Sequence, residues 1–278
     1  MERISNIPGT QVVSRVATLL RIVARTGESG ISLPGIVRAS GLTRPTAHRL
    51  LAALAAEGLL DASEETGRWH LGPELYVMGT VAAGRFAIED LARPSLRRLA
   101  EETGESAFLS IRRGNETVCL VREEGSFPIR SFVLHEGVRF PLGVASAGLV
   151  IMAYLPEDEV EALFADDGDR ESRFGPEHAP GRLRERLEAT RRTGYAVNPG
   201  LIVEGSFGMG AAVFDPQGRP AWALSLTGIE PRFRPDRQPF LGKLLLEEAH
   251  RITQRLRKAP SSPAAGRAPS GATSGGSR

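Results

Sequence analysis

The 278-residue sequence has little cysteine, little lysine and no long apolar stretch. Its one cysteine, Cys119, excludes an intrachain disulfide. No apolar run approaches the roughly 20 residues that a membrane-spanning helix needs. The first ten residues contain the acidic Glu2 and no apolar core, so we expect no signal peptide. These absences predict a cytoplasmic protein with no membrane partner.

The basic residues are almost all arginine, and they are spread unevenly along the chain. Residues 1–56 contain seven arginines against two acids, a net charge of +5, whereas residues 81–258 are close to neutral. A basic segment attached to a neutral remainder is typical of a chain that binds a polyanion such as nucleic acid through that segment.

Three helices are predicted within the first 60 residues. Residues 12–26 carry apolar side chains at helical spacing. Ser32 is suited to cap a second, shorter helix that ends at Gly41. Thr43 is suited to cap a third helix, with Pro45 in its first turn, where the missing N–H costs little.

Two strand-like stretches follow, residues 59–62 and 68–71, joined by a turn that ends at Gly67. The order helix, helix, four-residue turn, helix, hairpin is that of a winged helix-turn-helix, which we place at residues 1–72. In this motif the third helix enters the DNA major groove, where arginine can bond two acceptors of guanine. The candidate DNA contacts are Arg44, Pro45, Thr46, His48 and Arg49 on that helix and Arg68 beside the hairpin tip.

The rest of the chain alternates helical and strand-like segments. Residues 73–87 are predicted to form a linker helix and residues 88–258 a second domain. Residues 259–278 consist mainly of Pro, Ala, Gly and Ser, which predicts a disordered tail. Within the second domain, helices are expected at 88–103, 145–155, 157–164, 181–193 and 236–258, and strands at 107–111, 118–121, 208–214 and 221–227. The fold class is therefore α+β.

No motif in the sequence indicates catalysis or a metal. Ser146 does not lie in a Gly-x-Ser-x-Gly elbow, and there is no phosphate-binding glycine loop. Cys119 lies in an apolar strand and is expected in the core. The five histidines are scattered, and each is expected to be a surface or capping residue: His48, His70, His135, His178 and His250. We therefore predict that the protein is not an enzyme and that it binds neither a metal nor a cofactor.

Two alternatives stay open at this point. The chain could be an enzyme acting on a small molecule, which turnover of a ligand would reveal. It could also be a protein-interaction module that uses the winged helix for protein contacts. Salt dependence separates that module from a DNA-binding protein, because binding through several phosphates weakens steeply as salt rises.

Five segments in a fixed order carry a resemblance to a known family. They are GLTRPTAHRLL (residues 41–51), GRWHLG (67–72), LAEETGE (99–105), RTGYA (192–196) and AWALSLTG (221–228). With them, residues 12–257 resemble the IclR family of bacterial transcription regulators. The resemblance implies a homodimer or tetramer on a palindromic operator. It also implies a GAF-like antiparallel-sheet domain that binds a small-molecule effector, commonly a carboxylate or an aromatic metabolite. The regulator would act as a repressor or as an activator.

The resemblance also implies where the effector binds. A loop matching residues 142–148 holds the effector carboxylate with backbone N–H groups in this family. Asn198 stands where an acid is common and Gly208 where a cysteine is common, so a charge is lost and space is gained. We therefore expect a ligand larger or less polar than a two- or three-carbon acid. The implied effector-binding residues are Ser146, Ala147, Asn198, Gly208, Ser225 and Thr227.

Overall fold

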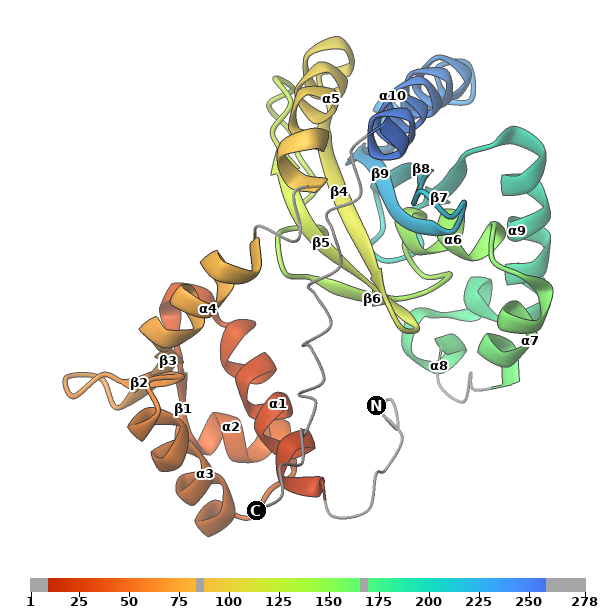
Figure 1. Ribbon diagram of the computed structural model, residues 1–278. Helices are drawn as coiled ribbons and strands as arrows, with labels where there is room; N and C mark the ends of the chain where they lie inside the picture. Colours follow the sequence, from red (N-terminus) through yellow and green to blue (C-terminus); the bar gives the residue numbers. More distant parts are fainter. Residues whose placement is uncertain (1–9, 84–87, 166–169, 259–278) are drawn as a thin grey trace, which may run out of the picture.

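The computed structural model describes residues 10–83, 88–165 and 170–258 (Figure 1). The predicted tail at 259–278, the first nine residues and residues 84–87 of the predicted linker lie outside these ranges. Within the described ranges, no helix is both long and apolar enough to cross a membrane.

The N-terminal part is a winged helix-turn-helix, as predicted. Its helices are α1 (Gln11–Ala24), α2 (Leu33–Ser40) and α3 (Arg44–Ala56), with a short turn η1 (Gly27–Ser29). Its strands are β1 (Ile31–Ser32), β2 (Leu60–Ala62) and β3 (Arg68–Leu71), antiparallel in the order β1-β3-β2. The apolar sides of the three helices meet Leu60 of β2 in one core, to which the helices contribute Leu19, Ile22, Val23, Ile36, Leu51 and Leu54.

Two details of the helix ends differ from the prediction. Ser32 does cap α2, with its hydroxyl accepting from the N–H of Gly35 at 3.4 Å. Thr43 precedes α3, but its hydroxyl donates to that of Thr46 at 2.9 Å instead of capping the helix. Arg44 is already helical, so the turn between α2 and α3 has three residues and not four. Gly41 takes the left-handed conformation that ends α2 (φ 68°).

The C-terminal part is a six-stranded antiparallel sheet in the order β6-β5-β4-β9-β8-β7. The strands are β4 (Ser106–Arg113), β5 (Glu116–Glu123), β6 (Arg139–Pro141), β7 (Ala196–Pro199), β8 (Ser206–Phe214) and β9 (Pro220–Ile229). The sequence did not predict β1, β6 or β7. Two to four residues are too few to show an alternating pattern, and these strands lack the tight turn that marks the equally short β2 and β3 as a hairpin.

Helices cover both faces of this sheet (Figure 1). The helices of this part are α5 (Ile88–Thr103), α6 (Ser146–Ala153), α7 (Glu157–Ala165), α8 (Arg170–Phe174), α9 (Pro180–Thr193) and α10 (Gln238–Lys258), with turns η2 (Pro176–His178) and η3 (Glu230–Arg232). α5 and α10 lie side by side on one face, and α6 and α9 pack on the other. α4 (Pro73–Ala83) precedes α5 in the chain. Short α8 was not predicted.

Successive side chains of β9 point to opposite faces of the sheet. Leu224 and Leu226 belong to the core formed with α5 and α10, whereas Ala223 belongs to the core formed with α6. Ser225 and Thr227 therefore share the α6 face with Ala223. Both are buried there, at 0% and 8% exposure.

The expectation that His178 is a surface or capping residue is wrong. Its side chain is fully buried on η2. One ring nitrogen, Nδ1, lies 2.9 Å from the carbonyl oxygen of Phe174, and Nε2 lies 3.3 Å from that of Val144. Burial, and then the nearby Arg186, lower the pKa of His178. A single histidine in a short turn shows no periodicity, so its burial could not be predicted from the sequence.

Candidate DNA interface and ligand pocket

One side of α3 is free of the core. Ala47, Leu51 and Leu54 are buried, and the other side of the helix faces outward. Thr46 is half-buried. The remaining predicted contact residues of α3 are all exposed: Arg44, Pro45, His48 and Arg49. This surface can therefore reach a DNA groove without disturbing the core.

Arg68 is exposed beside the hairpin tip, and one nitrogen of its guanidinium group is already bonded. Its Nη1 donates to the carbonyl oxygens of Ser29 and Gly30, both at 3.1 Å, which ties β3 to η1. These two bonds engage only Nη1, so a contact with DNA would use Nε or Nη2 of the same exposed side chain. The hairpin tip itself carries the exposed acids Glu64 and Glu65.

A pocket opens on the α6 face of the sheet. Its volume is about 360 Å³, including the part open to solvent. It brings together four predicted residues from α6, β7, β8 and β9. The other two, Ala147 and Ser225, are buried but do not line it. The lining residues are Val133, Leu134, Phe140, Ala145, Ser146, Asn198, Ile202, Ser206, Phe207, Gly208 and Thr227.

The N-terminus of α6 faces this pocket. Ala145 and Ser146 line the pocket, and no side chain in the described part of the chain caps the helix. The first N–H groups of a helix have no partner within it and carry a partial positive charge, so this end attracts an anion. The lining side chains carry no charge. The arrangement can hold a single carboxylate beside hydroxyl groups and an apolar wall.

Asn198 lines the pocket, but both ends of its amide are already bonded. Its Nδ2 donates to the carbonyl oxygen of Val144 at 2.5 Å, and its Oδ1 accepts from the N–H of Leu201 at 3.3 Å. In this state Asn198 fixes the loop that leads into α6. Only its second amide N–H and the second lone pair of its oxygen remain for a ligand.

Two family profiles match the chain. Residues 12–63 match the IclR helix-turn-helix domain, and residues 80–254 match the C-terminal domain of bacterial transcriptional regulators of the IclR type. The chain belongs to the IclR family.

Named relatives agree with this assignment. The HTH-type transcriptional regulator BhcR of Paracoccus denitrificans is 29% identical over 247 residues, which cover 88% of this chain and 87% of BhcR. The HTH-type transcriptional regulator KipR of Bacillus subtilis is 26% identical over 226 residues, 81% of this chain and 90% of KipR. An IclR homologue from Microbacterium hydrocarbonoxydans, solved with 4-hydroxybenzoate, shares the fold with a TM-score of 0.73 at 23% identity, covering 89% of this chain and all of that one.

This IclR-family protein is a DNA-binding transcription regulator controlled by a small-molecule effector, as the sequence predicted. Because these relatives are transcription regulators, the family assignment argues against both alternative hypotheses, an enzyme and a protein-interaction module.

Glycine at two positions of β8 allows α6 to approach the sheet in this regulator. A Cβ at Gly208 would lie 3.2 Å from the hydroxyl oxygen of Ser146, and one at Gly210 would lie 3.1 Å from its carbonyl oxygen. Ser225 pairs with Gly210. Its hydroxyl is buried and has no hydrogen-bond partner in the described part of the chain.

The apolar wall of the pocket was missed by the sequence analysis. Val133, Leu134 and Phe140 come from the segment after β5 and from short β6. That segment has neither helical nor alternating periodicity, and only its folding back over the sheet brings it to the pocket.

Proposed function

We propose that this regulator binds an inverted-repeat operator as a homodimer, with dimers able to pair into tetramers, and that a monocarboxylate with an aromatic or branched apolar body controls it. The uncapped N-terminus of α6, opening on a pocket without charged side chains, carries the effector part of the proposal. The site of action is the cytoplasm, where the chromosome lies.

The surface of α4 supports the homodimer. Tyr76, Val77, Met78 and Val81 are exposed at 77%, 51%, 52% and 78%. These side chains spread over about half of the circumference of the helix. An exposed apolar surface of this kind is typical of an interface. A second copy related by a two-fold axis would cover part of this surface and would present two α3 helices to two half-sites.

Selection of bound duplexes from a random pool by the full-length protein tests this proposal. We expect the selected sequences to contain an inverted repeat, with half-site centres about one helical turn or a multiple of it apart, because each dimer presents two identical helices. Measuring the affinity for the repeat and for one half-site provides the check. Equal affinity for both would contradict the dimer.

We assign the DNA contacts to Arg44, Pro45, Thr46, His48 and Arg49. The first turn of α3 is placed to meet a phosphate through backbone N–H groups. Arg49 follows one turn later and is exposed for a base edge. Arg68 has the lesser part, since one nitrogen of its guanidinium group is already bonded to Ser29 and Gly30.

The acidic hairpin tip gives a testable consequence. Glu64 and Glu65 would lie near phosphates if the hairpin flanked the groove, as wings do. Replacing both by glutamine is expected to tighten operator binding several-fold, roughly three- to tenfold at low salt, because a repulsion of like charges is removed. Fluorescence anisotropy with a labelled operator at two salt concentrations measures this effect.

The matched control replaces Glu185 and Glu188, two exposed acids of α9, by glutamine. This variant changes net charge by the same amount at a distance from the hairpin in sequence and domain. If both double variants tighten binding equally, net charge and not the position of the hairpin acids is responsible.

The lining of the pocket defines the effector class. Ser146, Ser206 and Thr227 supply hydroxyl groups, and Val133 and Phe140 belong to the apolar wall. A dianion would find no cation among the lining side chains, and a cation would find no acid. The 4-hydroxybenzoate bound by the relative from Microbacterium hydrocarbonoxydans belongs to the class proposed here.

Linkage then gives the mechanism. An effector that fits the pocket better in one arrangement of the dimer shifts the population toward that arrangement, and so changes the spacing of the two α3 helices. The operator must change effector affinity by the same factor that the effector changes operator affinity.

A further inference from the structure

The segment between β5 and β6, residues 124–138, runs along the pocket, and we call it the strap. Val133 and Leu134 of the strap line the pocket. The hydroxyl groups of Ser131 and Ser206 are 2.7 Å apart and fasten the middle of the strap to the start of β8. Ser206 itself lines the pocket. An occupant of the pocket therefore touches both the strap and its fastening.

The first part of the strap is anchored to the end of α5. The N–H of Phe127 donates to the carbonyl oxygen of Gly104 at 3.0 Å. A side chain at Gly125 would overlap that same carbonyl group, so the two backbones lie in direct contact. The Phe127 ring centre lies 4.4 Å from the guanidinium carbon of Arg232. Arg232 is thus a charged side chain in direct contact with the first part of the strap.

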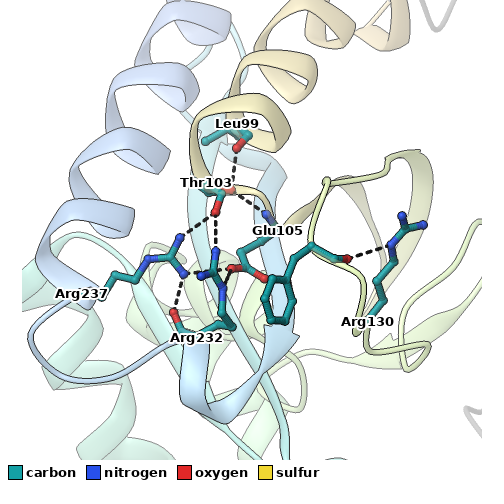
Figure 2. A network of polar contacts seen from close by, with 7 residues as sticks. Leu99, Thr103, Glu105, Arg130, Arg232 and Arg237 are labelled. Carbon is teal, nitrogen blue, oxygen red and sulfur yellow. Dashed lines mark hydrogen bonds and ion pairs between the residues drawn. The ribbon is translucent and has the colours of Figure 1, made fainter.

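Arg232 is also part of an ionic cluster around the buried Glu105, which comprises Glu105, Arg232 and Arg237 (Figure 2). The Glu105 side chain is 1% exposed, and its Oε1 accepts from Arg232 Nε at 2.7 Å and Arg237 Nη1 at 2.9 Å. Both arginines donate through Nη2 to the carbonyl oxygen of Thr103, at 3.1 and 2.6 Å. Thr103 is the last residue of α5, so the cluster provides the partners for its C-terminal end.

A second connection leads from the pocket to the same cluster. Ser106, the residue after Glu105, pairs with Thr227, which lines the pocket. A Cβ on Gly228, the residue after Thr227, would lie 2.5 Å from Oε2 of Glu105. The cluster thus adjoins both the strap and the strand that forms the floor of the pocket.

We propose that the Glu105 cluster couples the strap to α5, so that an effector that moves the strap also moves this helix. The inference rests on the proposed function, in which the pocket binds the effector. One rigid, planar guanidinium group, that of Arg232, contacts Phe127, Glu105 and the end of α5, so these contacts shift together. The other end of α5 follows α4 in the chain, which places the moving helix next to the linker of the DNA-binding domain.

Hydrogen exchange of the free full-length protein tests the coupling without ligand or DNA. Phe127→Leu keeps an apolar side chain but removes the ring beside Arg232. We expect the amides of Gly104 and Glu105, which are bonded to Ala100 and Thr103, to exchange about 3- to 30-fold faster, together with the strap.

Phe132→Leu is the matched control. Phe132 lies on the same strap and is also stacked by an arginine, Arg122 at 5.5 Å, but that arginine is outside the Glu105 cluster. This variant is expected to change exchange within the strap and to leave Gly104 and Glu105 at the wild-type rate. Unchanged exchange of these two amides in Phe127→Leu overturns the proposal, as does an equal increase in both variants.

A second measurement adds the selected operator duplex. Because coupling is reciprocal, DNA is expected to change exchange in the strap of the wild type and of Phe132→Leu, but not of Phe127→Leu. Retention of the DNA effect in a folded Phe127→Leu protein contradicts the coupling. Failure to select an operator would count against the proposed operator, whereas the comparison of the free proteins still decides on the coupling.

Discussion

An Arg49→Ala variant is expected to bind its operator about 10- to 100-fold more weakly than the wild type. Arg49 is exposed on α3, one turn beyond the first helical residue, on the side opposite Ala47 and Leu51 of the core. A bidentate arginine contact with guanine contributes about 1–3 kcal/mol of discrimination, and 1.4 kcal/mol corresponds to a factor of ten. Truncation of an exposed side chain leaves the core intact, so the variant should fold normally.

The measurement compares operator and unrelated duplexes. Loss of a base contact lowers affinity for the operator more than affinity for unrelated DNA, whereas loss of a phosphate contact lowers both alike. Arg182→Ala, at an exposed position of α9, removes the same charge from the other domain and should leave both affinities close to wild type. Unchanged operator binding by folded Arg49→Ala would exclude Arg49 from the interface.

The α3 surface could be predicted from the sequence because every part of the signal is local. Apolar residues at helical spacing define the buried side, and the rest of the helix must then face outward. α5 was likewise predicted at residues 88–103 and found at Ile88–Thr103, since 16 residues display a clear period. An element could be predicted when its apolar residues recurred clearly at helical or alternating spacing, wherever it lay in the chain.

The bonding of individual polar groups could not be predicted. Arg68 has its partners in η1, 38 and 39 residues earlier in the chain. Glu105 and Arg232, which form the centre of the ionic cluster, are 127 residues apart. Neither pairing leaves a periodic trace in the sequence, because the first arises only when β3 pairs with β1 and the second only when β9 pairs with β4.

In the pocket, too, some features could be predicted from the sequence and others could not. The family resemblance pointed to Ser146, Asn198, Gly208 and Thr227, and the structure brings these four into one pocket. These four side chains are not equally available to a ligand, because the Asn198 amide already has a hydrogen bond at each end. A role carried over from relatives identifies a position, whereas the local hydrogen bonds determine what the side chain there can do.

Gly208→Val is expected to weaken binding of benzoate-sized acids about 10- to 100-fold and to leave operator binding without ligand unchanged. A Cβ at this position already lies 3.2 Å from the Ser146 hydroxyl, so a branched side chain must enter the pocket. Overfilling a packed site costs about 1–3 kcal/mol, which corresponds to this range. Isothermal titration with benzoate, 4-hydroxybenzoate, pyruvate and glyoxylate measures the effect.

The control for this prediction is Ser225→Ala. Ser225 is buried behind the pocket without lining it, and its hydroxyl has no partner among the described residues, so its removal should leave acid binding at the wild-type level. The wild type is expected to prefer the two aromatic acids, since glycine at 208 leaves room for a ring against Val133 and Phe140. Tighter binding of glyoxylate or pyruvate, or no binding of aromatic acids at millimolar concentration, would contradict the effector class. Wild-type affinity in Gly208→Val would instead place the effector outside this pocket.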